Sequence, residues 1–91
     1  MKKRTHCHIN GRVQGVGFRY FAQELAVNNH LVGWVQNNDD GTVELEAEGE
    51  EKEIKSFLLA LKKGNRFASV LTIQDRDMNV TEREKSFKIS Y

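Results

Sequence analysis

Residues 5–19, THCHINGRVQGVGFR, join three different patterns in one short stretch. Over residues 5–13 apolar and polar residues alternate, which is the period of a half-buried strand. Residues 14–17 follow as a glycine-rich loop, because Gly15 and Gly17 can adopt left-handed backbone torsions. From Phe18 onward, apolar residues recur every three or four positions and predict an amphipathic helix over residues 18–29. The stretch therefore predicts a strand, a tight loop and a helix in succession.

The rest of the chain continues this alternation of strands and helices. A strand is expected over residues 31–36, and Asp40-Gly41 then marks a hairpin turn. Residues 42–48 alternate without interruption, with the acidic side chains facing water, and Gly49 is expected to break that strand. A second helix should end at residue 63, since basic residues fill its last turn and Gly64 suits the position after it.

Two more strands are expected at residues 70–73 and 85–91, the latter with Phe87, Ile89 and Tyr91 pointing inward. The resulting order, β-α-β-β-α-β with a short extra strand, predicts the α+β class. The expected architecture is a ferredoxin-like split βαβ sandwich, an antiparallel sheet with two helices on one face.

Length and composition limit the classes of protein this can be. The chain has 91 residues, a formal net charge of +1 and one cysteine. Residues 1–91 fit a single domain, and one cysteine supports neither an internal disulfide nor a multi-thiolate metal site. The balanced charge disfavours a nucleic-acid partner, and no apolar run approaches the roughly 18 residues of a membrane span. Because no apolar signal segment follows the basic residues at 2–4, we expect a cytoplasmic protein. A monomer is the plain expectation for its oligomeric state.

The glycine-rich loop is the first candidate site. Its backbone N–H groups can converge beside the helix N-terminus, and Arg19 in the first helical turn can bring its guanidinium to the same point. Such an arrangement favours an anion, above all a phosphate. A tight turn with a surface arginine explains the glycines alone equally well. The first 23 residues contain five basic residues and no acid, which favours the anion site.

Asn37 is the second candidate. It ends the second expected strand, and a place for that strand beside the first would bring Asn37 near the glycine-rich loop. Its carboxamide can both donate and accept, so it can hold a water molecule. A turn asparagine with a local Asx hydrogen bond is the simpler interpretation of its position.

Other chemically capable residues are expected to be structural. His6 and His8 share one strand face, where a solvent-exposed pair is more common than a metal site. Cys7 points inward and is expected to be a core residue. The eight acidic residues between positions 39 and 53 are expected to form an ordinary solvated face.

Two longer motifs resemble those of the acylphosphatase family. Residues 9–19, INGRVQGVGFR, resemble its first signature, and GWVQN at residues 33–37 with Gly41, Val43 and Gly49 resembles its second. One departure is visible, since family members often have a proline in the loop after the second helix, and residues 64–67 contain none.

The resemblance implies a hydrolase that converts acyl phosphates to a carboxylate and inorganic phosphate, with no cofactor and no metal. It implies that Arg19 binds the phosphate and that Asn37 positions the attacking water. The phosphate-binding stretch is then Gly15, Val16, Gly17, Phe18 and Arg19.

The chemistry of the reaction agrees with so sparse a site. The leaving carboxylate has a conjugate acid with a pKa near ~4, so it departs at neutral pH without a general acid. Phosphoryl transfer otherwise needs mainly positioning and charge stabilisation.

Three other functions share this order of elements. An RNA-recognition module would need aromatic residues on the exposed face of the third strand, where this chain has Thr42, Glu44, Glu46 and Glu48. A metal-carrying module would need paired cysteines after the first strand. A non-catalytic module that binds a phosphorylated metabolite remains the alternative, because the sequence does not separate binding from turnover.

Overall fold

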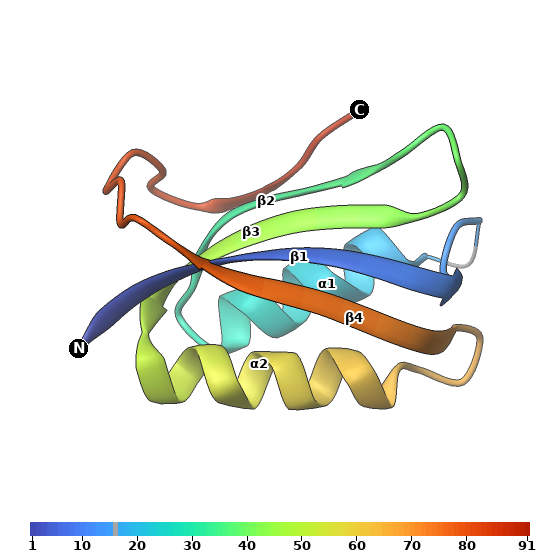
Figure 1. The fold of residues 1–91 in the computed structure, drawn as a ribbon, viewed down its shortest axis with the longest axis horizontal. Coiled ribbons are helices and arrows are strands. Elements are labelled where there is room, and N and C mark those ends of the chain that lie inside the picture. Colours follow the sequence, from blue (N-terminus) through green and yellow to red (C-terminus); the bar gives the residue numbers. More distant parts are fainter. Residues whose placement is uncertain (16) are drawn as a thin grey trace.

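The computed structural model describes residues 1–15 and 17–91 and contains one mixed sheet with two helices (Figure 1). The elements follow the chain as β1 (Lys2–Arg12), α1 (Phe18–Asn28), β2 (Val32–Asn37), β3 (Val43–Glu50), α2 (Glu51–Lys63), β4 (Ser69–Met78) and β5 (Phe87–Ile89). The predicted ferredoxin-like α+β fold is confirmed.

The strand order across the sheet is β4-β1-β3-β2-β5. Its first three pairings are antiparallel, as expected, whereas β5 pairs with β2 in parallel. The expectation that the second strand lies beside the first is wrong, because β3 occupies the place between them. Since β1 and β2 are both antiparallel to β3, they point the same way and end at the same end of the sheet.

One apolar core lies between the sheet and both helices. It joins the inward residues of β1, such as Cys7 and Ile9, to Phe18 and Ala22 of α1 and to Phe57 of α2, all at most 1% exposed. Because both helices share this core with the same face of β1, they cover one side of the sheet. Burial raises the pKa of the Cys7 thiol to about 12, as expected of a core cysteine rather than a nucleophile.

Several expected boundaries are wrong. β1 begins at Lys2 rather than at residue 5, and β5 begins at Phe87 rather than at residue 85. Gly49 does not break its strand but lies buried within β3, where a Cβ would come within 2.5 Å of the Leu31 side chain. The fourth strand continues to Met78, because β1 provides a pairing partner as far as Arg4. The fifth strand ends at Ile89, and Tyr91 is 87% exposed rather than inward.

The acidic face of β3 is also not simply solvated. Glu48 is 2% exposed and lies beside Arg4, which is fully buried. The Arg4 guanidinium donates to Glu46 at 2.8 Å and to Glu48 at 3.1 Å, and it binds Glu84 through both of its terminal nitrogens. Glu48 in turn accepts the backbone N–H groups of Thr81 and Glu82. This ion-pair cluster of Arg4, Glu46, Glu48 and Glu84 ties the segment after β4 over the sheet.

Candidate active site

A small cavity lies where β1 and β2 end, between the glycine-rich loop and the start of α1. Its volume is about 110 Å³. This is below the roughly 300–1,000 Å³ of pockets for drug-sized ligands, so it suits a small group. The described lining residues are Val13, Gly15, Gly17, Phe18, Arg19, Tyr20 and Asn37. The cavity therefore brings together every described residue proposed for the site; Val16 lies outside the described residues.

Two glycines of the loop have backbone conformations that other residues rarely adopt. Gly15 and Gly17 have φ angles of 74° and 75°, and nothing lies within 4 Å of where their Cβ atoms would be. The left-handed conformation, rather than lack of space, therefore requires glycine there.

Gly17 is the N-cap of α1. No side chain caps this end, and the first turn contains no acidic residue. The unpaired N–H groups and positive end of the helix dipole are thus available to an anion. Phe18, 1% exposed, anchors this first turn in the core.

The C-terminal segment holds the Arg19 side chain. Its Nη1 donates to the Ser90 carbonyl at 3.2 Å, and its guanidinium lies 4.8 Å from the centre of the Tyr91 ring. The Tyr91 hydroxyl lies 3.1 Å from that of Tyr20, and this hydrogen bond raises the pKa of Tyr91, which stays neutral at pH 7. These contacts leave the positive charge of Arg19 without a carboxylate partner among the described residues.

Asn37 contributes an unusual acceptor. Its Oδ1 atom is buried. In residues 1–15 and 17–91 it is the one buried side-chain nitrogen or oxygen atom without a hydrogen-bond partner. A buried acceptor left unpaired costs about 1–3 kcal/mol, which favours a site for a ligand or a water molecule.

The simpler interpretation of Asn37 as a turn residue with an Asx bond is wrong. The turn after β2 is instead closed by Asp40, which accepts from the Thr42 backbone N–H, and by Asn38, which donates to the Thr42 hydroxyl. Asn37 is thereby left free to face the cavity.

Gln14 links the two halves of the site, and sequence reasoning missed it. Its Nε2 donates to the carbonyls of Asn38 at 2.7 Å and Thr42 at 2.8 Å. These bonds fix the glycine-rich loop against the β2–β3 turn. The loop and the turn lie at the end of the molecule opposite the N-terminus (Figure 1). The sequence signal that could have pointed to Gln14 was a polar side chain in the loop, placed between Val13 and Gly15.

The roles of Tyr20, Ser90 and Tyr91 were also missed. They depend on β5 lying parallel to β2, and this pairing has no local sequence signal.

The charge argument for an anion site holds only in part. Of the five basic residues in the first 23, Lys2, Lys3 and Arg4 lie at the far end of β1 and pair with acidic residues there. Arg12 and Arg19 alone lie near the loop. The local charge of the site is therefore smaller than the sequence count indicates.

The histidines of β1 lie away from this cavity, on the other sheet face. His6 Nε2 lies 2.6 Å from Glu44, and His8 Nε2 lies 2.9 Å from the Thr42 hydroxyl. Both are half-buried rather than solvent-exposed. Within the described part of the chain, no group of three or more potential metal ligands occurs. No described helix is long and apolar enough to cross a membrane.

Comparisons with known proteins agree with the fold and the motifs. The acylphosphatase family model matches residues 5–89. An acylphosphatase of Clostridium acetobutylicum is 50% identical over 91 residues, a match that covers 100% of both chains. An acylphosphatase of Geobacillus thermodenitrificans is 49% identical over 89 residues, which are 98% of this chain and 95% of that one. The crystal structure of acylphosphatase from Bacillus subtilis superposes with a TM-score of 0.93 at 44% identity and covers 100% of both chains. Because family model, relatives and structure agree over nearly the whole length, this chain belongs to the acylphosphatase family of enzymes.

Proposed function

We propose that this protein hydrolyses small acyl phosphates to a carboxylate and inorganic phosphate without a metal ion, using Arg19 and Asn37 as catalytic residues. The observation that supports this most directly is that Asn37, whose Oδ1 is buried and unpaired, lines the same 110 Å³ cavity as Arg19 and the glycine-rich loop. An anion-binding group and a side chain with an unused acceptor then line one small volume.

The phosphoryl group binds first in this mechanism. Its oxygens accept hydrogen bonds from backbone N–H groups of residues 15–19 and from the Arg19 guanidinium, which compensates their negative charge. The Ser90 carbonyl and the Tyr91 ring restrict the Arg19 side chain before substrate arrives, so less conformational freedom is lost on binding.

The attacking water is held by Asn37. Its Oδ1 accepts one O–H of the water, which turns a lone pair of the water oxygen toward phosphorus, opposite the acyl oxygen. As the P–O bond to the acyl group breaks, the bond electrons leave with the carboxylate. The water proton passes to a phosphate oxygen, because the described lining contains no histidine, cysteine, aspartate or glutamate.

The same lining explains the choice of substrate. A phosphomonoester has an alkoxide leaving group, which needs a general acid; among the described lining residues only Tyr20 has a phenolic proton, and its hydroxyl is paired with that of Tyr91. The carboxylate of an acyl phosphate leaves without protonation.

The test is the disappearance of benzoyl phosphate with wild type, Arg19→Ala, Arg19→Lys and Asn37→Ala. Losing one preorganised hydrogen bond costs about 10²-fold in kcat, the loss expected for Asn37→Ala. Arg19→Ala should lose more, because binding is lost too, and Arg19→Lys should not restore it, since an ammonium lacks the bidentate geometry.

Arg12→Ala is the matched control. Arg12 is the other basic residue near the loop but is exposed and does not line the cavity, so its loss should change kcat/KM by less than about threefold. Activity should persist in excess EDTA. Near-normal turnover by Arg19→Ala would contradict the mechanism, and a protein that binds benzoyl phosphate but leaves it intact would be the non-catalytic module.

We propose further that the protein acts as a single-domain cytoplasmic monomer. Every group assigned to the site comes from one copy of the chain, and its lone thiol is buried rather than placed for cross-linking. Size-exclusion chromatography with light scattering tests the oligomeric state, and activity per mole of protein that rises with protein concentration would contradict the monomer.

A further inference from the structure

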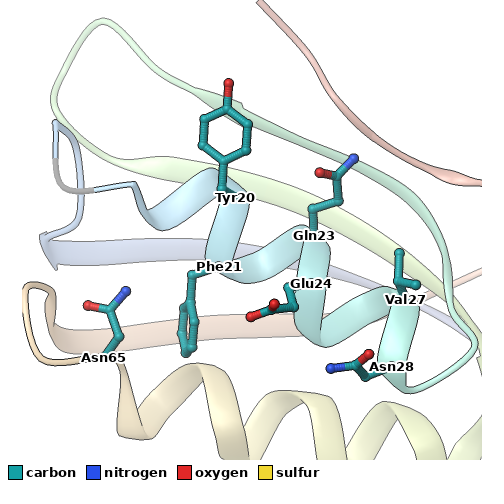
Figure 2. Close-up of a pocket in the computed structure, with 7 residues that line it drawn as sticks. All are labelled: Tyr20, Phe21, Gln23, Glu24, Val27, Asn28 and Asn65. Atoms are coloured by element: carbon teal, nitrogen blue, oxygen red, sulfur yellow. The ribbon is translucent and has the colours of Figure 1, made fainter.

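A second and larger hollow runs along the outward face of α1, beside the phosphate cavity (Figure 2). Its volume is about 540 Å³, within the range of small-molecule sites. It is lined by residues of α1 and by one residue of the loop after α2: Tyr20, Phe21, Gln23, Glu24, Val27, Asn28 and Asn65. We call this hollow the α1 groove.

The α1 groove and the phosphate cavity meet at one residue. Tyr20 lines both of them. In an acyl phosphate a single oxygen joins the phosphoryl group to the acyl carbon, so the acyl group must lie directly next to the bound phosphoryl group. A cavity of about 110 Å³ does not hold both halves of a larger substrate. The α1 groove, which shares Tyr20 with the cavity, offers room for the acyl half next to that ring.

The side chains of the groove select an uncharged group. Tyr20 and Val27 are 60% and 58% exposed, so the helix presents an aromatic ring and a branched aliphatic side chain to solvent one above the other. Residues 20, 24 and 27 lie on one helix face by spacing. The Tyr20 ring itself offers a flat wall for an aromatic or aliphatic group, while its hydroxyl pairs with that of Tyr91.

Besides Tyr20, the polar side chains of the groove are three amides, Gln23, Asn28 and Asn65, and one carboxyl, Glu24. The Oδ1 of Asn65 is already used, because it accepts the backbone N–H groups of Phe67 and Ala68. Figure 2 shows its amide nitrogen directed toward α1, where it can donate. Glu24 is the one acidic residue, and there is no basic one, among the described lining residues. Its negative charge repels an acyl group that bears a second carboxylate.

We propose that the α1 groove is the acyl subsite, and that it favours uncharged aromatic or aliphatic acyl groups over carboxylate-bearing ones. The proposal rests on the proposed function, since it assigns the half of the substrate that the phosphate cavity does not contact.

The test compares kcat/KM for benzoyl, acetyl and succinyl phosphate. Acetyl phosphate is too short to extend along the groove, so the ratio of benzoyl to acetyl kcat/KM isolates the groove from the phosphate cavity. Tyr20→Ala should lower this ratio about 2- to 10-fold, the range of one aromatic contact. Tyr20→Phe keeps the ring but loses the bond to Tyr91, and should keep the ratio of the wild type. Glu24→Gln should raise kcat/KM for succinyl phosphate about 2- to 5-fold at low salt, an effect that salt removes.

Leu59→Ala is the matched control, because Leu59 is an equally exposed apolar residue on α2 outside the groove, and it should leave both quantities unchanged. If the wild type hydrolyses acetyl phosphate but Tyr20→Ala lowers kcat/KM for benzoyl and acetyl phosphate by the same factor, the acyl subsite is refuted and the proposed function stands. If Tyr20→Phe lowers the ratio as much as Tyr20→Ala, the ring is not the contact and the subsite is again refuted. If the wild type hydrolyses none of the three, the proposed function fails, and the subsite with it.

Discussion

Replacing Arg4 by methionine should destabilise this protein far more than the loss of any other basic residue of β1. Arg4 is fully buried, and its guanidinium binds Glu46, Glu48 and Glu84 at donor–acceptor distances of 2.8–3.1 Å. Methionine fills a similar volume but leaves Glu48, which is 2% exposed, as an uncompensated buried charge. Breaking a buried pair in this way costs about 3–5 kcal/mol.

That loss is large for a domain of this size. The free energy of unfolding of a domain is about 5–15 kcal/mol. A loss of 1 kcal/mol in that free energy lowers the Tm of a 60–100-residue domain by about 4–8 °C. The expected fall in Tm is therefore on the order of 12–40 °C. Urea unfolding followed by far-UV circular dichroism measures the free energy, with Lys2→Met as control. Lys2 is half-exposed and pairs with Glu82 at 3.5 Å, so its removal should cost less than about 1 kcal/mol.

Two further measurements sharpen this prediction. Arg4→Met combined with Glu48→Leu should cost less than the sum of the single losses, by about 1–3 kcal/mol, because neither charge is then left alone. The folded fraction of Arg4→Met should keep its kcat, since Arg4 lies eight residue steps along β1, about 27 Å, from Arg12 beside the glycine-rich loop. If Arg4→Met costs no more than Lys2→Met, the buried cluster does not have the role described here.

Other predictions concern pH, backbone and core. The pKa of Glu84 is lowered from its usual 4.5, first by its hydrogen bond to Arg4, and that of Glu48 is lowered because backbone N–H groups and Arg4 outweigh its burial. A lowered pKa in the folded state means stability that is complete above about pH 5 and is lost as pH falls through the folded values, so urea midpoints should fall steadily below pH 4.5. Gly33→Ala should cost more than about 2 kcal/mol, because its φ is +144° and a Cβ would come within 1.9 Å of the Glu46 carbonyl oxygen; Gly41→Ala, with φ +92° and open space, should cost less in the same urea titration, and equal losses would contradict this reasoning. Phe57→Ala should cost about 3–5 kcal/mol because the ring is fully buried, whereas Leu59→Ala, 72% exposed, should stay within about 0.5 kcal/mol by thermal unfolding.

Local periodicity was sufficient to predict most of the fold. The alternation over residues 5–13 and 42–48 and the helical spacing from Phe18 and Ile54 each describe one element against one core, and β1, β3 and the two helices occur where these patterns predict them. The two candidate residues were also found, because a glycine-rich loop before a helix and an asparagine at a strand end each have a chemical meaning of their own.

Long-range contacts account for what the sequence did not predict. By alternation Arg4 and Glu48 belong to the solvent face, and they are buried only because the segment that contains Thr81 and Glu84 crosses over them. The polar residues Gln74 to Asp77 have no strand period, and they form part of β4 because the edge of β1 is available to pair with them. Such contacts depend on where a distant segment lies, and no window of local sequence contains that information.

The strand order has a consequence for how this chain folds as it is made. β1 lies inside the sheet and pairs with β4, where Thr5 is opposite Asp77, so its last neighbour is synthesised about 70 residues after it. At about 5–20 residues per second, the backbone edge of β1 that pairs with β4 waits roughly 4–14 s before this neighbour is synthesised. A sheet closed by such distant pairings is expected to fold in milliseconds to seconds rather than microseconds. β3 aligns the ends of β1 and β2 early, but the groups that hold Arg19 at the cavity, the Ser90 carbonyl and the Tyr91 ring, are synthesised after β4.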